Sequence, residues 1–383
     1  MVDRIVKSFL VGIVLVALGQ SPLFAGLVFI PLGDLPGAFG TTDFYSIAYG
    51  VSNDGSTVVG TSASGAHGYE AFRWTAGEGM VGLGFGGTGM DASADGGVIV
   101  GHSGSEAFRW TSGTGKVGLG DLPGGTVWSS AAGVSADGTV IVGESVSDNG
   151  EEAFRWTEAG GMIGLGDLPN GVFSSEAHGV SDDGNLVVGI GTKGGNFFEG
   201  FKWTNDSGMV GIGVMPGGTE TVAHAVNDAG DVVGAGKSGG AISLSPPQAF
   251  LNLGSLGDFA VGGSLFTYAN DLSADADIVV GYGRLYGDGE AFLWTSTFGM
   301  QPIRDLLIAH GNDMTGWDLK EATAISSNGN YIVGYGTNPD GKTEAWLISD
   351  IQSVPEPSSF VLLIGLSAGL AGFTAYRRRR RAA

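Results

Sequence analysis

The sequence contains no cysteine, so it has neither a disulfide framework nor a cysteine-ligated metal site. Charge is also scarce, since only 15% of the residues are charged, and 18 basic residues face 39 acidic ones for a net charge of −21. An acidic surface repels nucleic acid and anionic lipid, because both carry negative charge. These shortages exclude a disulfide-stapled domain and a nucleic-acid-binding protein, and they favour cations or neutral polymers as partners.

No helical period is sustained between Val28 and Ser349. The sequence has 72 glycines and is 43% hydrophobic, and the glycines separate short segments that are rich in β-branched and aromatic residues. Such segments are typical of strands joined by tight turns. The composition therefore predicts an all-β protein.

One repeating unit organises this region and is clearest from Ser130 to Leu165. Each copy contains four short β segments, and a Ser-x-Asp-Gly turn joins the first two. In such a turn Asp can bond its own backbone and Gly takes a positive φ, so the repeated carboxylate is interpreted as structural.

Three markers each recur seven times along the chain. The turn glycine stands at Gly55, Gly96, Gly138, Gly184, Gly230, Ala276 and Gly329. The glycine that ends the second segment stands at Gly60, Gly101, Gly143, Gly189, Gly234, Gly281 and Gly334. The third-segment aromatic of a Glu-Ala-Phe tripeptide stands at Phe72, Phe108, Phe154, Phe201, Phe250, Phe292 and Trp346.

Four antiparallel strands in roughly 45 residues have the dimensions of a propeller blade. We therefore expect residues 26–350 to form a seven-bladed β-propeller. The last copy lacks its fourth strand, while the segment from Val28 to Gly37 has no partner of its own. The N-terminal strand is predicted to close the ring by completing the seventh blade.

The two ends of the chain carry export signals. Residues 1–25 combine basic Arg4 and Lys7 with an apolar run from Phe9 to Leu18 and are predicted to be a signal peptide, the alternative being a retained membrane anchor. Residues 351–383 place the apolar segment 360–376 before a basic tail, a pattern that predicts a transmembrane helix with its basic end in the cytoplasm. The residues of that topology signal are Arg377, Arg378, Arg379, Arg380 and Arg381.

This C-terminal region resembles the PEP-CTERM sorting signal of Gram-negative bacteria, through Val354, Pro355, Glu356 and Pro357 followed by the apolar span and the arginines. The resemblance implies cleavage near this motif by a membrane exosortase. It also implies a transient inner-membrane anchor, followed by release to the cell surface or the extracellular matrix, where exopolysaccharide or surface proteins become partners.

The body resembles the HAF family of extracellular repeats, named for the His/Glu-Ala-Phe tripeptide that Glu70, Ala71 and Phe72 represent here. The strand order is also similar to that of TolB-type propellers. The resemblance provides no catalytic residues. We therefore expect an exported, non-catalytic binding or structural module, and neither a cofactor nor a metal is predicted.

One repeated position changes freely while its neighbours stay the same. In the first segment it is occupied by Tyr49, Met90, Ala132, His178, His224, Asn270 and Thr323. The first strand of a propeller blade lies nearest the axis, so Tyr49, His178, His224 and Asn270 are predicted to form a polar mouth that contacts the ligand. The alternative interpretation is that the two histidines pack between blades.

Two copies depart from the repeat. The fifth is expected to carry an inserted loop at 243–247 before Phe250, and the seventh a loop at 303–320. The second loop supports the alternative function, a polysaccharide hydrolase or lyase. Its site would be on residues 303–321, formed by His310, Asp313, Asp318 and Glu321.

Overall fold

The computed structural model describes residues 26–37, 45–194, 197–214, 218–236, 240–245, 249–252, 266–285 and 288–351. The predicted signal peptide, the PEP-CTERM tail and its transmembrane segment lie outside the described residues. No helix in the described part is long and apolar enough to cross a membrane. Residues Gly26–Ile351 form one compact unit, close to the predicted 26–350 domain.

The described strands form seven four-stranded antiparallel sheets, which we number as blades in chain order. Blade 1 consists of β2 (Ser46–Val51), β3 (Val58–Ser64), β4 (Gly68–Thr75) and β5 (Gly79–Gly86). Blade 2 consists of β6 (Thr88–Ala92), β7 (Val98–Ser103), β8 (Glu106–Thr111) and β9 (Gly115–Gly118). Blade 3 consists of β10 (Gly124–Val134), β11 (Val140–Ser147), β12 (Gly150–Thr157) and β13 (Gly161–Gly164).

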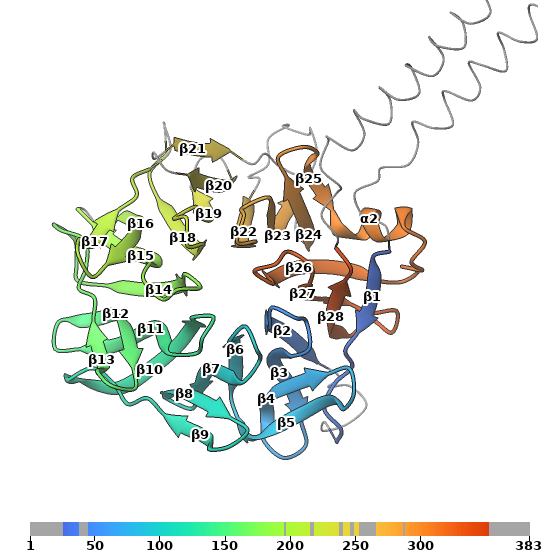
Figure 1. Ribbon diagram of the computed structural model, residues 1–383, viewed down its shortest axis with the longest axis horizontal. Coiled ribbons are helices and arrows are strands. Elements are labelled where there is room, and N and C mark those ends of the chain that lie inside the picture. The colour runs from blue at the N-terminus through green and yellow to red at the C-terminus, as the bar shows by residue number, and fades with distance from the viewer. Residues whose placement is uncertain are drawn as a thin grey trace, which may run out of the picture. The chain divides into compact units, whose positions relative to one another are not determined.

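Blade 4 consists of β14 (Ser175–Val180), β15 (Val187–Lys193), β16 (Phe197–Thr204) and β17 (Gly208–Gly211). Blade 5 consists of β18 (Thr221–Val226), β19 (Val232–Gly236), β20 (Gly240–Ser245) and β21 (Ala249–Asn252). Blade 6 consists of β22 (Phe266–Leu272), β23 (Ile278–Leu285), β24 (Asp288–Thr295) and β25 (Gly299–Pro302). Blade 7 contains β26 (Asp318–Ile325), β27 (Ile332–Thr337), β28 (Thr343–Ser349) and β1 (Val28–Pro31). Figure 1 shows these sheets arranged around a centre, with the first strand of each copy innermost. The predicted all-β ring of small four-stranded antiparallel blades is confirmed.

The N-terminal strand closes the ring, as predicted. β1 pairs antiparallel with β28, from Val28 opposite Ser349 to Pro31 opposite Trp346. The amide side chain of Asn312 holds the closing strand, because its Oδ1 accepts from Phe29 N at 3.2 Å and its Nδ2 donates to Leu27 O at 2.9 Å.

The repeated aromatic residues fill the space between blades. Phe72, Phe108, Phe154, Phe201, Phe292 and Trp346 are all buried. Phe154 of blade 3, for example, packs with Val98, Leu119 and Leu122 of blade 2. Each sheet therefore covers the face of the next one, as stacked blades require.

Repeated polar residues fix the turns and the connections between blades. Ser135 Oγ donates to Asp137 Oδ1 at 2.7 Å and accepts from Val140 N at 3.0 Å, while Gly138 has a φ of 73°. Glu152 Oε1 accepts from Gly166 N at 3.0 Å and so caps the loop that leads to blade 4. The structural interpretation of the repeated turn carboxylate is confirmed.

Two expectations about the irregular copies were wrong. In blade 5 the third strand is β20, and Phe250 lies on the outer strand β21, because residues 240–245 form a short hairpin with β19. Nearby hairpin partners pair more readily than distant ones. In blade 7 the predicted loop at 303–320 begins with a short helix, α2 (Ile303–Ala309), whose Ile303 and Leu307 are buried.

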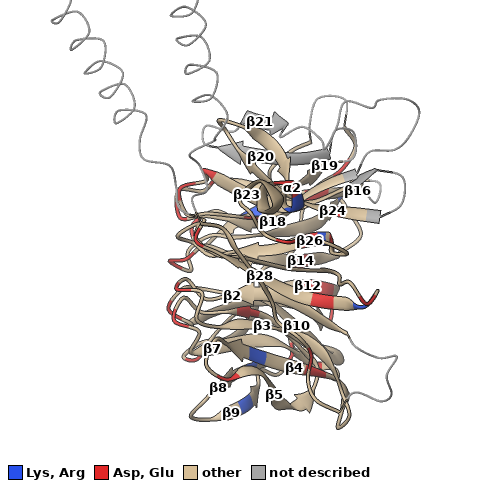
Figure 2. Ribbon diagram, turned by 90° about the vertical axis from the view of Figure 1, so that its right-hand side faces the viewer, with Lys and Arg blue, Asp and Glu red and all other residues tan. Residues whose placement is uncertain are grey.

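Figure 2 shows the domain from the side, with acidic residues repeated along one edge of the ring and few basic residues. Basic side chains are also involved in local contacts, as in the ion pairs of Arg73 with Glu78 and of Lys193 with Glu199. The negative net charge of the sequence is therefore carried by the folded domain.

Candidate functional site

The variable position of the first strand is a β-bulge. In all seven first strands the pairing register with the second strand shifts at this residue, for example between Ala48 and Gly50 around Tyr49, and between Ala177 and Gly179 around His178. The same shift surrounds Met90, Ala132, His224, Asn270 and Thr323. A bulge turns a side chain out of the regular alternation of a strand, and bulges are frequent next to functional sites.

The second repeated glycine is required by this bulge. A methyl group at Gly143 would overlap the carbonyl oxygen of Ser130, two residues before the bulge residue Ala132, and would lie 2.9 Å from the Cα of Ala131. The corresponding glycines of the other copies face the same carbonyl of their own first strand. The bulge at the variable residue therefore requires a glycine at the facing position of the second strand.

All seven bulge residues line one central cavity of about 190 Å³. Tyr49, His178, His224 and Asn270, which the sequence predicted to lie at a common mouth, are brought together there. The volume is below the usual 300–1,000 Å³ of small-molecule pockets, so the cavity admits only a small ligand or the end of a larger one.

Four of these side chains connect their blade to the next. His178 Nδ1 bonds to Ala223 O at 3.0 Å, and His224 Nδ1 to Ala269 O at 2.8 Å. Asn270 Nδ2 and Thr323 Oγ1 make the same connection to Ala322 O at 2.9 Å and Ala48 O at 2.8 Å. Each accepting carbonyl directly precedes the next bulge residue, so the residues predicted as ligand contacts also hold neighbouring blades together.

Aromatic rings follow one another above this wall. The ring centroids of His178 and His224 are 5.7 Å apart, and those of His224 and Tyr268 are 6.3 Å apart. Tyr268 in turn stacks on its cross-strand partner Tyr282 at 5.0 Å. The row crosses blades 4, 5 and 6.

The electrostatics of the site are dominated by burial. Burial, reinforced by the neighbouring imidazole of His178, lowers the pKa of His224 to about 4, so this ring is neutral at physiological pH. Burial also raises the pKa of Tyr49 to about 12, with Tyr45 and Glu321 adding to the effect. Glu176 has a lowered pKa because His178 lies beside it, with Nε2 3.6 Å from Oε2.

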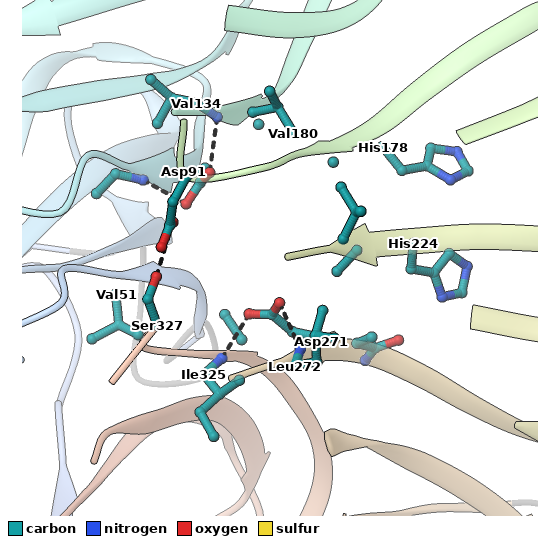
Figure 3. A pocket seen from close by; sticks show the side chains of 18 of the residues that line it. Val51, Asp91, Val134, His178, Val180, His224, Asp271, Leu272, Ile325 and Ser327 are labelled. Atoms are coloured by element: carbon teal, nitrogen blue, oxygen red, sulfur yellow. Dashed lines mark hydrogen bonds between the residues drawn. The ribbon is translucent and has the colours of Figure 1, made fainter. Parts of the chain in front are cut away.

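The sequence reasoning missed two carboxylates in the cavity. Asp91 accepts from Ala92 N at 2.7 Å and, across the blade boundary, from Val134 N at 2.9 Å. Asp271 does the same with Leu272 N at 2.8 Å and Ile325 N at 2.9 Å, and Figure 3 shows both carboxylates with these bonds. The available signal was an acid at a position that is glycine or alanine in the other five copies, Gly50, Gly133, Gly179, Ala225 and Ala324.

At the turns that follow the first strands, further bonds join the blades. The backbone of Asn53 donates to Ala94 O at 2.9 Å, and Ala94 donates to Ala136 O at 3.0 Å. Ser327 Oγ of blade 7 donates to Asp182 Oδ1 of blade 4 at 3.0 Å. Because these blades are not neighbours, that bond spans the cavity.

The cavity carboxylates should make the stability of the domain pH-dependent. Burial raises the pKa values of Asp91 and Asp271 to about 7, from about 3.9 in an unfolded chain. Their stabilising contribution is complete below pH ~4 and is lost as the pH rises through ~7, because the folded state holds these protons more tightly. Turn carboxylates such as Asp137 have lowered pKa values and act oppositely, losing their contribution as the pH falls below ~4.

We therefore expect the melting temperature to be higher at pH ~5 than at pH ~8. Scanning calorimetry across this range measures the difference. The double variant Asp91→Asn and Asp271→Asn should melt lower at every pH, but its slope between these pH values should be smaller. The melting temperature falls because the two backbone N–H groups bond to the two different oxygens of each carboxylate, and asparagine replaces one of these oxygens with an NH2 donor. An unchanged slope in the variant would assign the pH dependence to other groups.

The alternative catalytic residues are not gathered in one place. His310 Nδ1 bonds to Leu306 O at 2.7 Å at the end of α2, and the Asp313 carboxylate accepts from Thr315 N at 3.0 Å in an exposed turn. Asp318 pairs with Lys320 at 2.6 Å. Glu321 lies apart on β26, where it accepts from Asn270 Nδ2 at 2.8 Å and from Tyr335 Oη at 2.9 Å. The segment from α2 to Trp317 instead supports the closing strand, because Trp317 packs edge-on against Phe29 with centroids 4.9 Å apart.

Two histidines in adjacent blades could in principle share a metal ion if a third ligand joined them. Among the residues that the structure describes, no group of three or more His, Asp or Glu side chains is arranged to hold a metal ion. His178 and His224 each use Nδ1 in a blade-to-blade bond. The described side chains therefore provide two imidazole nitrogens and no converging third ligand of these types.

Solved structures with a similar fold include an oligogalacturonate lyase in complex with manganese. It is 13% identical, and the alignment covers 86% of this chain and 97% of that chain with a TM-score of 0.51. TolB from Acinetobacter baumannii is 13% identical over 68% of this chain, with a TM-score of 0.43, and the match spans 63% of the TolB chain. At these identities the likeness concerns the fold alone.

Comparison with sequences gives one finding, at the C-terminus. No curated protein sequence matches the chain significantly. The described repeats thus rest on the sequence and the structure alone, and the resemblance to HAF repeats stays an expectation. Residues 353–381 match the PEP-CTERM protein-sorting motif, which implies export, processing by an exosortase and transient membrane anchoring.

Proposed function

We propose that this protein is an exported β-propeller of the cell surface or extracellular matrix that acts as a non-catalytic binding or structural module. The observation that carries the proposal is the sorting motif at residues 353–381. Such a motif addresses a protein to an exosortase of a Gram-negative bacterium. The proposed order of events is passage through the inner membrane, cleavage and release.

The arrangement of the central cavity supports a binding role. Most blades repeat the same turn and core residues, whereas the bulge position carries six different residue types in the seven copies and lines the cavity in each. A rigid scaffold that presents variable side chains at one position of each blade is suited to ligand recognition. The bulge residues can change the contacts with a ligand while the fold of the blades stays the same. Exopolysaccharide or surface proteins are the proposed partners, contacted by Tyr49, His178, His224 and Asn270.

The local chemistry favours this role over the hydrolase or lyase alternative. Such an enzyme needs a pair of carboxylates on either side of a bound sugar. On the segment 303–321, Asp313 is exposed in a turn, Asp318 is paired with Lys320, and Glu321 is bonded to Asn270 and Tyr335. Fold similarity to a lyase does not by itself confer the reaction.

The sorting step can be tested by changing Pro355, Glu356 and Pro357 together to alanine. We expect this variant to stay in the membrane fraction, while the wild-type protein is shed in a shortened form, since the variant lacks the residues at which processing is proposed. Fractionation and intact-mass measurement distinguish the two forms.

The matched control replaces Ser358 and Ser359 with alanine, next to the motif, and should be processed normally. If the triple variant yields the same shed product as the wild type, the proposed exosortase route is wrong. If both variants are degraded, expression of residues 26–351 alone tests whether the domain folds without the tail.

A further inference from the structure

The hydrogen bonds of the cavity wall decide which ligand atoms it can bind. The backbone carbonyls of Ala223, Ala269, Ala322 and Ala48 can only accept, so the bulge side chain facing each must donate. The proton of His224 is therefore on Nδ1. Both amide hydrogens of Asn270 are also used, one by Ala322 O and one by Glu321 Oε1.

What these side chains keep for a ligand is acceptor capacity. In blades 5, 6 and 7 the remaining atoms are His224 Nε2, Asn270 Oδ1 and the lone pairs of Thr323 Oγ1. The carboxylates of Asp91, Asp182 and Asp271 add further acceptors to the same cavity. In blades 5 to 7 the bulge side chains thus have no donor left, so a ligand that contacts this part of the wall must bring its own hydrogen-bond donors.

The charge of the site disfavours an anionic ligand. No lysine or arginine lines the cavity, whereas three aspartates do, and Asp91 and Asp271 become negatively charged as the pH rises through about 7. Glu144, Glu176 and Glu321 surround its histidine and tyrosine side, and the pKa of Glu144 is raised to about 7 by burial and by its acidic neighbours. A carboxylate or phosphate placed here would meet like charge, which costs several kcal/mol in an interface.

The opposite part of the wall is less polar. Met90 and Ala132 occupy the bulge positions of blades 2 and 3, and neither side chain can donate a hydrogen bond. The cavity thus has an apolar patch at Met90 and Ala132, beside the carboxylate of Asp91, and acceptors in blades 5 to 7. A ligand with both a hydroxyl-bearing edge and a C–H face fits such a site.

From this geometry we propose that the cavity binds one neutral, hydroxyl-rich sugar unit, such as the end or a side branch of an uncharged polysaccharide. The proposal rests on the binding role proposed above and names its ligand class. Sugar hydroxyls donate to the wall acceptors, and a C–H face of the ring lies against Met90 and Ala132.

The spacing favours a sugar over a single bound cation. The acceptors are distributed over neighbouring blades, since the ring centroids of His178 and His224 are 5.7 Å apart. Hydroxyl groups on opposite sides of a pyranose ring are separated by a similar distance, whereas one ion needs all its ligands about 2–2.6 Å from its centre. The cavity of about 190 Å³ is also close to the size of one sugar unit.

The test uses the five histidines of the chain as reporters. The full chain, purified in detergent, is titrated with galactose, glucose, mannose and N-acetylglucosamine while the imidazole signals are recorded by NMR. Galacturonate, glucuronate and glucosamine are titrated in parallel as charged analogues with the same rings. His67, which is exposed on a turn of blade 1, serves as the internal control.

We expect at least one neutral sugar to shift the His178 and His224 signals with millimolar affinity and to leave His67 unchanged. Its uronate should bind at least about tenfold more weakly because of like charge. Glucosamine, whose ammonium group can donate to the same acceptors, should bind at least as well as glucose. Three outcomes overturn the proposal: a uronate that binds as well as the neutral sugar, glucosamine binding much more weakly than glucose, or four neutral sugars that leave both reporters unmoved.

Two variants of Met90 test whether the sugar binds in the central cavity. Met90→Lys places an ammonium group of similar length in the cavity, where it donates to the free acceptors, and should abolish the sugar-induced shifts. Met90→Gln has similar length without charge and should keep them within about threefold. Loss in both variants would assign Met90 to folding, and retention in both would contradict the site.

The two proposals fail separately. A protein that is shed and held at the cell surface, but binds none of the sugars, disproves this inference and leaves the proposed export and binding role standing. A protein whose tail is not processed disproves the proposed route of export, whatever the sugar titration shows.

Discussion

Deletion of residues 26–37 is expected to unfold the propeller or to lower its melting temperature by more than about 10 °C. The deletion removes β1, the outer strand of blade 7, and with it Leu32 and Leu35, which are buried in the cluster between blades 7 and 1. Loss of a single buried leucine costs about 2–5 kcal/mol, while whole domains are stable by only about 5–15 kcal/mol. Circular dichroism and calorimetry of the truncated chain measure the effect.

A peptide of residues 26–37, added in trans, is the control for this deletion. It should restore part of the lost melting temperature, because β28 keeps an edge that accepts the strand. Equal melting of the truncated and complete chains would show that β1 does not contribute to closure. A scrambled peptide of the same composition should restore nothing.

The second large effect is expected for Gly143→Ala. The added methyl group would overlap the carbonyl oxygen of Ser130, and because the obstacle is backbone rather than a flexible side chain, the strand pair must separate. We expect a loss of about 3 kcal/mol in the free energy of unfolding, at the upper end for overpacking. Chemical denaturation measures it.

Gly113→Ala is the matched control. A methyl group at Gly113 meets nothing within 4 Å, and this exposed glycine does not have a positive φ. The substitution should change the unfolding free energy by less than about 0.5 kcal/mol. Equal losses in both variants, or no loss at Gly143, would contradict the coupling between this glycine and the bulge.

The repeat made the architecture predictable from sequence. Asp137 and Gly138 predict a tight turn, and a buried aromatic equivalent to Phe154 recurs in six of the seven copies, so strand number and stacking follow from local patterns. The closing role of Val28–Pro31 was also predictable, since one copy lacked a strand that the other end provided. The strand order of blade 5 was predicted wrongly because Phe250 resembles the repeated aromatic residue of the third strand. In the structure residues 240–245 pair with β19 and form the third strand instead.

The site was predictable only in part. The sequence marks Tyr49 and His178 as variable, but the register shift that turns them into the cavity depends on pairing with another strand. The bonds of His178 and His224 to the next blade depend on tertiary spacing in the same way. Asp91 escaped notice because its partner Val134 belongs to a different copy, 43 residues away.

Ring closure through β1 and β28 also has a consequence for the timing of export. The two strands are joined from Val28 to Ser349, so the first described strand cannot pair until nearly the whole domain has been translated and has crossed the membrane. Until then blade 1 has no neighbour on one side, and the emerging chain carries an open sheet edge that can pair with other chains. Long-range closure is slow, because a large loop must be ordered before its contacts form. The interval between the first and the last strand is therefore the period in which a chaperone would be most needed.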